Sequence, residues 1–241
     1  MTTQAEEKPL YLGHRARLKE RFMVDNGASM PDYELLELLL TMAIPRRDVK
    51  PLAKKLISKF GSLGEVIQAP AIRLLDEAKL GVNTVVLLKA IASCMSRITY
   101  AKFADSDEPI ISSWEMFEDY CWQIMGCKEV EEFRIFFFDS DLHYKGSKLL
   151  TTGTINKVSI HPREVVKAAL ENNAVKVILA HNHPSGEPKP SEADKRLTRG
   201  IEELAEVMDF ELYDHVIVGK NGIFSFRNAG YIRPKKYENN I

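Results

Sequence analysis

The sequence predicts a small all-α domain followed by an α/β domain in which flanking helices cover a mixed sheet. In the first part, residues 13–104, apolar positions recur at helical spacing. In the second part, residues 131–139 and 174–180 are apolar runs rich in β-branched or aromatic side chains, as in buried strands. Residues 105–112 form an acidic, proline-bearing stretch between the two parts, which is typical of a domain boundary.

Composition limits the class of protein. A chain of 241 residues with 45% hydrophobic and 28% charged residues has enough apolar material for one large or two modest cores. No stretch approaches about 18 apolar residues, and the N-terminus has no apolar leader segment, so we expect no membrane contact and no secretory signal. The three cysteines lack C-x-x-C spacing, which argues against a disulfide framework or a cysteine zinc ribbon. These features favour a cytoplasmic location.

Charge differs between the two halves. Residues 1–105 carry 16 Lys and Arg against 12 Asp and Glu, and the remaining residues carry 17 against 22. A mildly basic first half permits contact with a phosphate backbone, although it does not by itself indicate a nucleic-acid-binding domain.

The helical domain is predicted to contain short helices joined by tight turns. Asp32 follows Pro31 and is the expected N-cap of the second helix, and Gly61 is expected to close the third. Residues 1–12 are expected to be a disordered tail. The predicted helices cover residues 14–22, 32–40, 49–60, 63–68, 71–78 and 84–104.

A turn before the last of these helices resembles the hairpin of a helix-hairpin-helix module. Gly81, Val82 and Asn83 occupy the positions of a G-x-G turn, which in such modules offers backbone N–H groups to a DNA phosphate. Asn83 replaces the second glycine; asparagine tolerates a left-handed conformation, but its side chain could hinder close approach. The alternative is an ordinary helix start with Asn83 as N-cap. DNA is therefore a candidate partner of this domain.

The second domain alternates helices and strands. A helix is predicted to start after Ser113 as N-cap, followed by the strand at 131–139 and its hairpin partner at 144–150. A helix from 161 to 169, the strand at 174–180, and a helix from Ser191 follow. A final hairpin, 212–218 with 222–226, turns at Asn221-Gly222.

The loop after the strand at 174–180 carries a candidate metal site. Strand side chains repeat every two residues, so His181 and His183 leave the strand end on the same side. Asp194 could add an oxygen ligand, and three protein ligands with one open position are typical of catalytic zinc. Ser191 and Asp194 also fit a capping box at the start of the next helix. The two interpretations are compatible, because a capped helix start would fix the direction of the Asp194 carboxylate.

These residues carry a family resemblance. The spacing of His181, His183, Ser191 and Asp194 is similar to the H-x-H…S-x-x-D motif of JAMM/MPN zinc metallopeptidases. The strings His181-Asn182-His183-Pro184-Ser185-Gly186, Gly153-Thr154-Ile155, His161-Pro162-Arg163-Glu164 and Asp214-His215-Val216-Ile217-Val218-Gly219 resemble the RadC family. The resemblance covers residues 14–233. It implies a JAMM/MPN-like domain over 113–233, with the layering of a cytidine deaminase, and leaves 234–241 as a tail.

The resemblance also implies a chemistry. One Zn²⁺ per chain, held by His181, His183 and Asp194, would support hydrolysis of a peptide or isopeptide bond in a peptide or protein substrate. The base of such enzymes is a Glu on an upstream strand. Glu131 shares a strand face with Phe133 and is the expected base, with Glu132 as second choice; the alternative is that both are solvated charges. Ser191 is expected to hold the oxyanion, with Ser185 as another hydroxyl in the loop.

Other interpretations stay open at this point. The family name implies an association with DNA repair, so a metal-dependent nuclease or a non-catalytic DNA-associated protein are the alternatives to a peptidase. Iron or manganese would also suit nitrogen and oxygen ligands. His215 beside Asp214 is expected to be a hydrogen-bonded core residue rather than a catalytic base. His161 is expected at a helix start, and Arg163 with Glu164 could form an ion pair.

Overall fold

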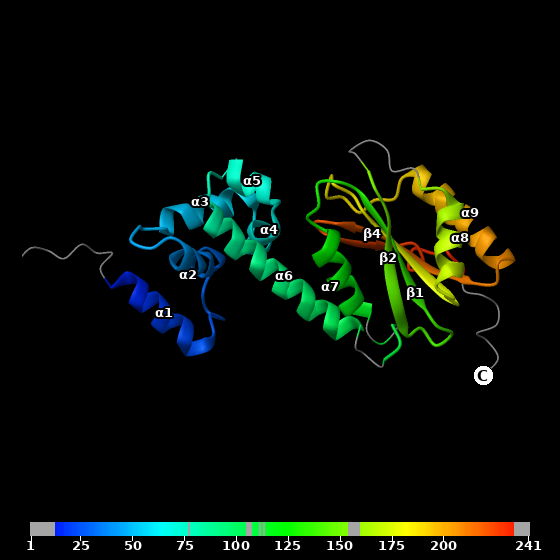
Figure 1. Ribbon diagram of the computed structural model, residues 1–241, viewed down its shortest axis with the longest axis horizontal. Helices are drawn as coiled ribbons and strands as arrows, with labels where there is room; N and C mark the ends of the chain where they lie inside the picture. The colour runs from blue at the N-terminus through cyan, green and yellow to red at the C-terminus, as the bar shows by residue number, and fades with distance from the viewer. Residues whose placement is uncertain are drawn as a thin grey trace, which may run out of the picture. The chain divides into compact units, whose positions relative to one another are not determined.

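The computed structural model describes residues 13–76, 78–104, 108–110, 112, 114–153 and 160–233 (Figure 1). The chain divides into two compact units, Met1–Cys94 and Met95–Ile241. Each unit is described by itself.

Within its described residues the first unit is all-α, as predicted. Its core is formed by side chains such as Leu36, Leu56, Val66 and Leu88. The helices are α1 (His14–Asp25), α2 (Asp32–Ala43), α3 (Lys50–Phe60), α4 (Leu63–Gln68), α5 (Ala71–Asp76) and the first part of α6 (Val82–Ala104).

Two predicted helix starts in this unit are wrong. Pro31, in extended conformation, is the N-cap of α2, and Asp32 is already the first helical residue. The Asp32 carboxylate accepts a hydrogen bond from the Leu63 backbone 31 residues away, so it satisfies the start of α4 instead. α6 begins at Val82, which places Asn83 inside the first turn, neither as N-cap nor in a left-handed conformation. Gly61, with φ 109°, follows α3 as expected.

α6 crosses the division between the units. Its first part packs Val85 and Leu88 into the core of the first unit, and Phe103 near its end packs into a core of the second. By length and composition α6 could cross a membrane, because an 18-residue window of it has a mean hydropathy of 1.2. Core helices of other folds meet the same criterion. The linker predicted at 105–112 lies partly outside the described residues and stays a prediction.

The second unit is the predicted α/β fold. Its sheet has the strand order β2-β1-β3-β4-β5, in which β3 and β4 are parallel and the other neighbours antiparallel. Ser113 and residues 154–159 lie outside the described part of the chain. The elements are α7 (Trp114–Met125), β1 (Glu132–Phe138), β2 (Tyr144–Thr152), α8 (Pro162–Glu171), β3 (Lys176–Asn182), α9 (Glu192–Val207), β4 (Glu211–Gly219) and β5 (Gly222–Ser225).

Helices cover both faces of this sheet. The alternating residues Phe133, Ile135 and Phe137 of β1 face α8 and α9, whereas Phe136 and Phe138 face α7. Figure 1 shows α7 on one side of the sheet and α8 and α9 on the other. The period-two pattern of β1 thus gives a three-layer α/β/α unit, as the resemblance implied.

The centre of the sheet positions the candidate site. β3 runs to Asn182, two residues further than predicted, so His181 lies within the strand. The parallel neighbour β4 pairs His181 with Ile217, and the antiparallel neighbour β1 pairs it with Phe133. The carboxyl ends of β3 and β4 therefore meet the start of β1 at one edge of the sheet, and the loop to α9 leaves from that edge.

Candidate metal centre

His181, His183 and Asp194 converge on one point. His181 comes from the end of β3, His183 from the loop after it, and Asp194 from the first turn of α9. The His181 and His183 Nε2 atoms are 3.1 Å apart, and they lie 3.4 and 3.7 Å from the nearer Asp194 oxygens. Ligand atoms about 2.0–2.1 Å from a tetrahedral zinc ion are about 3.3 Å from one another. The spacing therefore fits three ligands of one ion.

The donor set is electron-rich. Burial lowers the pKa of His181 to about 4, so this ring stays neutral and offers a lone pair. Burial would raise the pKa of Asp194, but His183 beside it and the hydrogen bonds from Ser191 hold that pKa well below its usual value. Asp194, whose Oδ2 is 3.7 Å from His183 Nε2, raises the pKa of His183. A divalent cation satisfies the same three acceptors, and the residues fit a metal.

The second nitrogen of each ligand histidine is held by the fold. His183 Nδ1 donates to the Glu187 carbonyl at 2.9 Å, and His181 Nδ1 lies 2.9 Å from His215 Nε2. Such partners orient metal-binding histidines and direct the other nitrogen to the ion.

The loop between β3 and α9 packs against the end of β4. Gly186, with φ 89°, accepts a hydrogen bond from the Lys220 backbone at 3.0 Å. A Cβ on Gly219 would lie 2.4 Å from the Gly186 carbonyl oxygen, so only glycine fits there. This contact fixes the path of the chain just after His183.

Ser191 and Asp194 form the predicted capping box. The Ser191 hydroxyl accepts from the Asp194 backbone at 3.2 Å, and the Asp194 carboxylate accepts from the Ser191 backbone at 2.7 Å. The same hydroxyl lies 2.6 Å from Asp194 Oδ2. Capping therefore holds the Asp194 carboxylate next to the two histidines, so the cap is compatible with the predicted role as a metal ligand. Ser185, the other hydroxyl of the loop, is exposed.

The two candidate bases lie in different surroundings. Glu131 directly precedes β1 and is half-buried; burial raises its pKa, His183 lowers it and Asp194 raises it. His183 and Asp194 are both candidate metal ligands, so the Glu131 carboxylate is electrostatically linked to the candidate site. Glu132 is buried and forms ion pairs with Lys128 and Arg134. Because Glu132 is held in ion pairs, whereas Glu131 forms none with the described residues, Glu131 stays the predicted base.

Sequence reasoning missed Asn182, which lies between the two histidines. Its side-chain oxygen accepts from the Glu132 backbone at 2.8 Å, and its amide donates to the Val130 carbonyl at 3.1 Å. These two bonds grip the chain on both sides of Glu131. The period-two alternation of a strand predicts Asn182 on the opposite face from the histidines. The sequence does not indicate that its side chain bonds the backbone of residues 130 and 132.

His215 is a buried, hydrogen-bonded residue, as expected, but Asp214 does not orient its ring. The Asp214 carboxylate accepts from the backbone of His215 and of Arg227 and from the Ser225 hydroxyl. The His215 ring instead contacts His181 and, at 2.7 Å, the Thr198 hydroxyl. Thr198 had no role in the prediction, because a threonine within an amphipathic helix carries no motif.

The remaining predicted features form no hydrogen bond or ion pair with His181, His183 or Asp194 within the described residues. His161 is the N-cap of α8, and Arg163 pairs with Glu164 at 3.2 Å. In the first unit, Gly81, Val82 and Asn83 are exposed at the start of α6.

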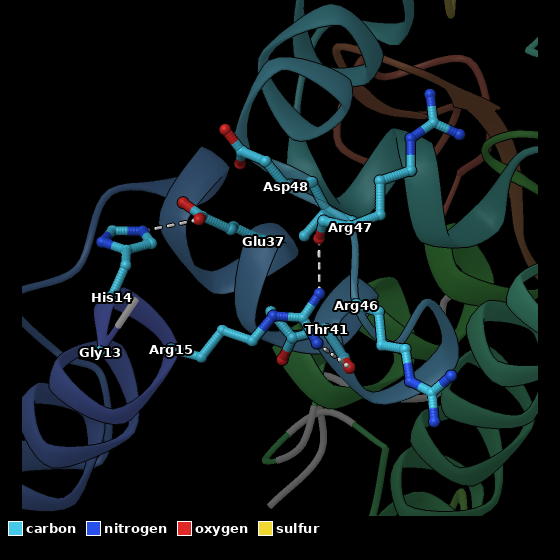
Figure 2. A pocket seen from close by; sticks show the side chains of 9 residues that line it. Gly13, His14, Arg15, Glu37, Thr41, Arg46, Arg47 and Asp48 are labelled. Carbon is cyan, nitrogen blue, oxygen red and sulfur yellow. Dashed lines mark hydrogen bonds and ion pairs between the residues drawn. The ribbon is translucent and has the colours of Figure 1, made fainter. Parts of the chain in front are cut away.

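The first unit has a cavity of its own, of about 380 Å³ (Figure 2). His14 Nε2 meets Glu37 Oε1 there at 2.7 Å. The Arg15 guanidinium donates to the carbonyls of Ile44 and Arg47, at 2.9 and 2.5 Å, and so holds the turn after α2. Arg15 is thus committed to the fold rather than free for a ligand. The cavity is lined by Gly13, His14, Arg15, Glu37, Thr41, Arg46, Arg47, Asp48 and Val49.

Comparison with known proteins places the chain in a family. Residues 111–231 match the family model described as a RadC-like JAB domain. The chain is 42% identical over 225 residues to a UPF0758 protein of Ruegeria pomeroyi, covering 93% of this chain and 100% of that one. It is also 42% identical over 215 residues to a UPF0758 protein of Rhodobacter capsulatus, covering 89% and 100%. The chain therefore belongs to the RadC family and carries a RadC-like JAB domain.

Proposed function

We propose that this protein is a zinc-dependent hydrolase of the JAMM type that cleaves a peptide or isopeptide bond. The observation that carries the proposal is the convergence of two histidine nitrogens and one carboxylate beside a half-buried glutamate. Zinc in such a site supplies a water of lowered pKa, about 7, and polarises a substrate carbonyl. A protein that only kept the fold would need neither the three acceptors nor the glutamate beside them.

Glu131 is the proposed general base. Hydrolysis of an amide requires a group that takes a proton from water and passes it to the leaving nitrogen. Burial raises the pKa of Glu131, which makes its carboxylate a better proton acceptor. Asn182 holds the backbone on both sides of Glu131 and so fixes the position from which it acts.

Ser191 is the proposed oxyanion donor. Its hydroxyl lies beside Asp194 and is exposed. To stabilise the tetrahedral oxyanion, this hydroxyl would turn its hydrogen from Asp194 Oδ2 to the substrate oxygen. The backbone bond from Ser191 to Asp194 would keep the carboxylate in place during that exchange.

The test combines metal content with turnover. Purified wild-type protein should contain about one zinc ion per chain by mass spectrometry, and His183→Ala and Asp194→Ala should lose it. His161→Ala and Asp119→Ala, the latter an exposed position in α7, remove the same residue types outside the proposed ligand set and should retain it. Glu131→Gln should keep the zinc and lose hydrolysis of peptide and isopeptide libraries, whereas Glu132→Gln should remain active. Zinc-free wild-type protein after zinc-supplemented purification would refute the proposal.

We also infer that the first unit contacts DNA, the alternative that the family name suggests. A Cβ on Gly81 would meet no atom within 4 Å, so the backbone at the start of α6 is open to close approach. Arg46 and Arg47 are exposed, whereas Arg15 is held by backbone carbonyls. Reversing the charge of Arg46 and Arg47 should weaken binding to duplex DNA and reduce its salt dependence. Binding that is unchanged by these reversals would remove DNA from the partners of this unit.

A further inference from the structure

Two buried polar side chains, His215 and Thr198, lie on the Nδ1 side of His181 and have no part in the proposed reaction. His181 Nδ1 is 2.9 Å from His215 Nε2, and His215 Nδ1 is 2.7 Å from the Thr198 hydroxyl. That hydroxyl is 2.7 Å from the backbone carbonyl of Asp194. His181 and His215 are 0% exposed and Thr198 is 2% exposed. We call these three side chains the Thr198–His215–His181 row.

The direction of every hydrogen bond in the row follows from its last member. A backbone carbonyl can only accept, so the Thr198 hydroxyl donates its one hydrogen to Asp194. Thr198 must then accept from His215, which places the His215 hydrogen on Nδ1. A neutral imidazole carries one such hydrogen, so His215 Nε2 is an acceptor. His181 Nδ1 must therefore donate to it, which leaves His181 Nε2 with a free lone pair.

Aromatic neighbours hold the two rings in this orientation. Phe133 stacks on His181 with 5° between the ring planes, and Phe226 stacks on His215 with 11° between them. Turning either ring over would bring carbon atoms to the positions that its nitrogens now occupy, and buried hydrogen-bonding groups would lose their partners. The rings are therefore confined to one arrangement.

We propose that Thr198 and His215 are positioning residues that keep the hydrogen of His181 on Nδ1 and so keep its Nε2 lone pair directed at the metal. This inference rests on the proposed metal site. Without an acceptor at position 198, His215 can carry its hydrogen on Nε2 and donate it to His181 Nδ1. The hydrogen of His181 would then lie on Nε2, where it would block a metal ion. Thr198 and Asp194 both lie in α9. The helix that supplies the carboxylate ligand therefore also determines which nitrogen of His181 carries the hydrogen.

The experiment separates the hydroxyl from the shape of the side chain. Thr198→Val removes the hydroxyl at similar size, and Thr198→Ser retains it. Thr41→Val is the matched control, since Thr41 is a buried helical threonine in the first unit whose hydroxyl donates to the Leu38 carbonyl at 2.6 Å. Two quantities are measured. Nitrogen-15 NMR of the metal-free protein reports which histidine nitrogen carries the hydrogen, and competition with a chromophoric chelator gives the affinity for zinc alone.

In the metal-free wild type we expect His181 and His215 to carry their hydrogens on Nδ1. Thr198→Val should move the His181 hydrogen to Nε2 and lower zinc affinity about 10- to 100-fold, the usual effect of losing a partner of a metal-binding histidine. Thr198→Ser and Thr41→Val should stay near wild type.

Two results would overturn the inference. One is the finding that His181 of the wild type carries its hydrogen on Nε2, a measurement that requires neither a variant nor a metal. The other is a Thr198→Val protein whose histidine hydrogens and zinc affinity match those of Thr41→Val. If wild-type protein binds no zinc, the proposed function fails, and the NMR measurement still decides the direction of the row.

Discussion

Asp194 is expected to contribute twice, once as a helix cap and once as a metal ligand, and the two contributions can be separated by substitution. Ser191→Ala removes the hydroxyl that caps α9 but leaves the carboxylate. Asp194→Asn keeps an oxygen that can accept from the Ser191 backbone but removes the negative charge. The first variant should affect folding with or without metal, whereas the second should mainly affect folding with metal.

The magnitudes follow from the structure. Loss of a serine N-cap costs about 1 kcal/mol of unfolding free energy. Loss of a negative charge in the first turn of a helix costs about 0.3–1 kcal/mol. Zinc at a free concentration 100 times its dissociation constant stabilises the native state by about 2.7 kcal/mol. For a unit of the size of residues 95–241, each kcal/mol shifts the melting temperature by about 2–4 °C.

Thermal unfolding followed by circular dichroism, with zinc and with chelator, is the assay. Wild type should gain about 5–11 °C on zinc addition. Ser191→Ala should melt about 2–4 °C lower in both conditions and keep the zinc-induced gain. Asp194→Asn should melt about 1–4 °C lower than wild type in chelator, from the lost helix-terminal charge, and should lose the zinc-induced gain. An Asp194→Asn protein that gains as much from zinc as wild type would refute the assignment of Asp194 as a ligand.

Three further predictions concern the surroundings of the site. Asn182→Ala should lower the unfolding free energy by about 1–3 kcal/mol in urea denaturation, because it leaves the buried Glu132 N–H unpaired, whereas the Val130 carbonyl is only partly buried and can bond water. It should also reduce turnover more than zinc content, and unchanged turnover would contradict its role in placing Glu131. Gly219→Ala should lower the unfolding free energy by about 1–3 kcal/mol and weaken zinc binding, because the added Cβ would press on the Gly186 carbonyl. Gly200→Ala, at a helical position with open space around it, is the control and should be neutral or stabilising. Equal effects of the two substitutions would contradict the close contact at Gly219. In chelator, the His183–Asp194 pair should stabilise the protein most between about pH 4 and pH 6.5. The folded-state pKa of His183 is raised, so its contribution to stability is lost as the pH rises through that pKa. The folded-state pKa of Asp194 is lowered, so its contribution is lost as the pH falls below the pKa of Asp194 in the unfolded chain. His183→Gln should remove the loss above pH 6.5, and an unchanged pH profile would count against the pair.

Much of the fold follows from local patterns. The apolar run at residues 131–139 predicts a strand, and β1 (Glu132–Phe138) is that strand. Turn residues such as Gly61 ended elements as expected, because their conformational preferences act over a few residues. The predictions of Asp32 and Asn83 as N-caps were wrong. Each helix begins earlier than predicted, after Pro31 and after Gly81, and the Asp32 carboxylate bonds the backbone of Leu63, a partner distant in the sequence.

The candidate metal ligands follow from the same kind of local pattern. His181 and His183 share a strand face, and Ser191 with Asp194 starts a helix, so both pairs are set by spacing along the chain. That the two pairs meet depends on the loop between them, which Gly186 and Gly219 hold against β4.

The sequence by itself determined the two-part organisation, the helices and strands, and which residues could ligate a metal. Only the tertiary structure decided which groups support those ligands. His215 reaches His181 across 34 residues because β3 and β4 are parallel neighbours in register, and Asn182 reaches the backbone beside Glu131 across 50 residues because β1 pairs with β3. Strand order and register depend on the packing of the whole sheet, so no spacing within one segment encodes them.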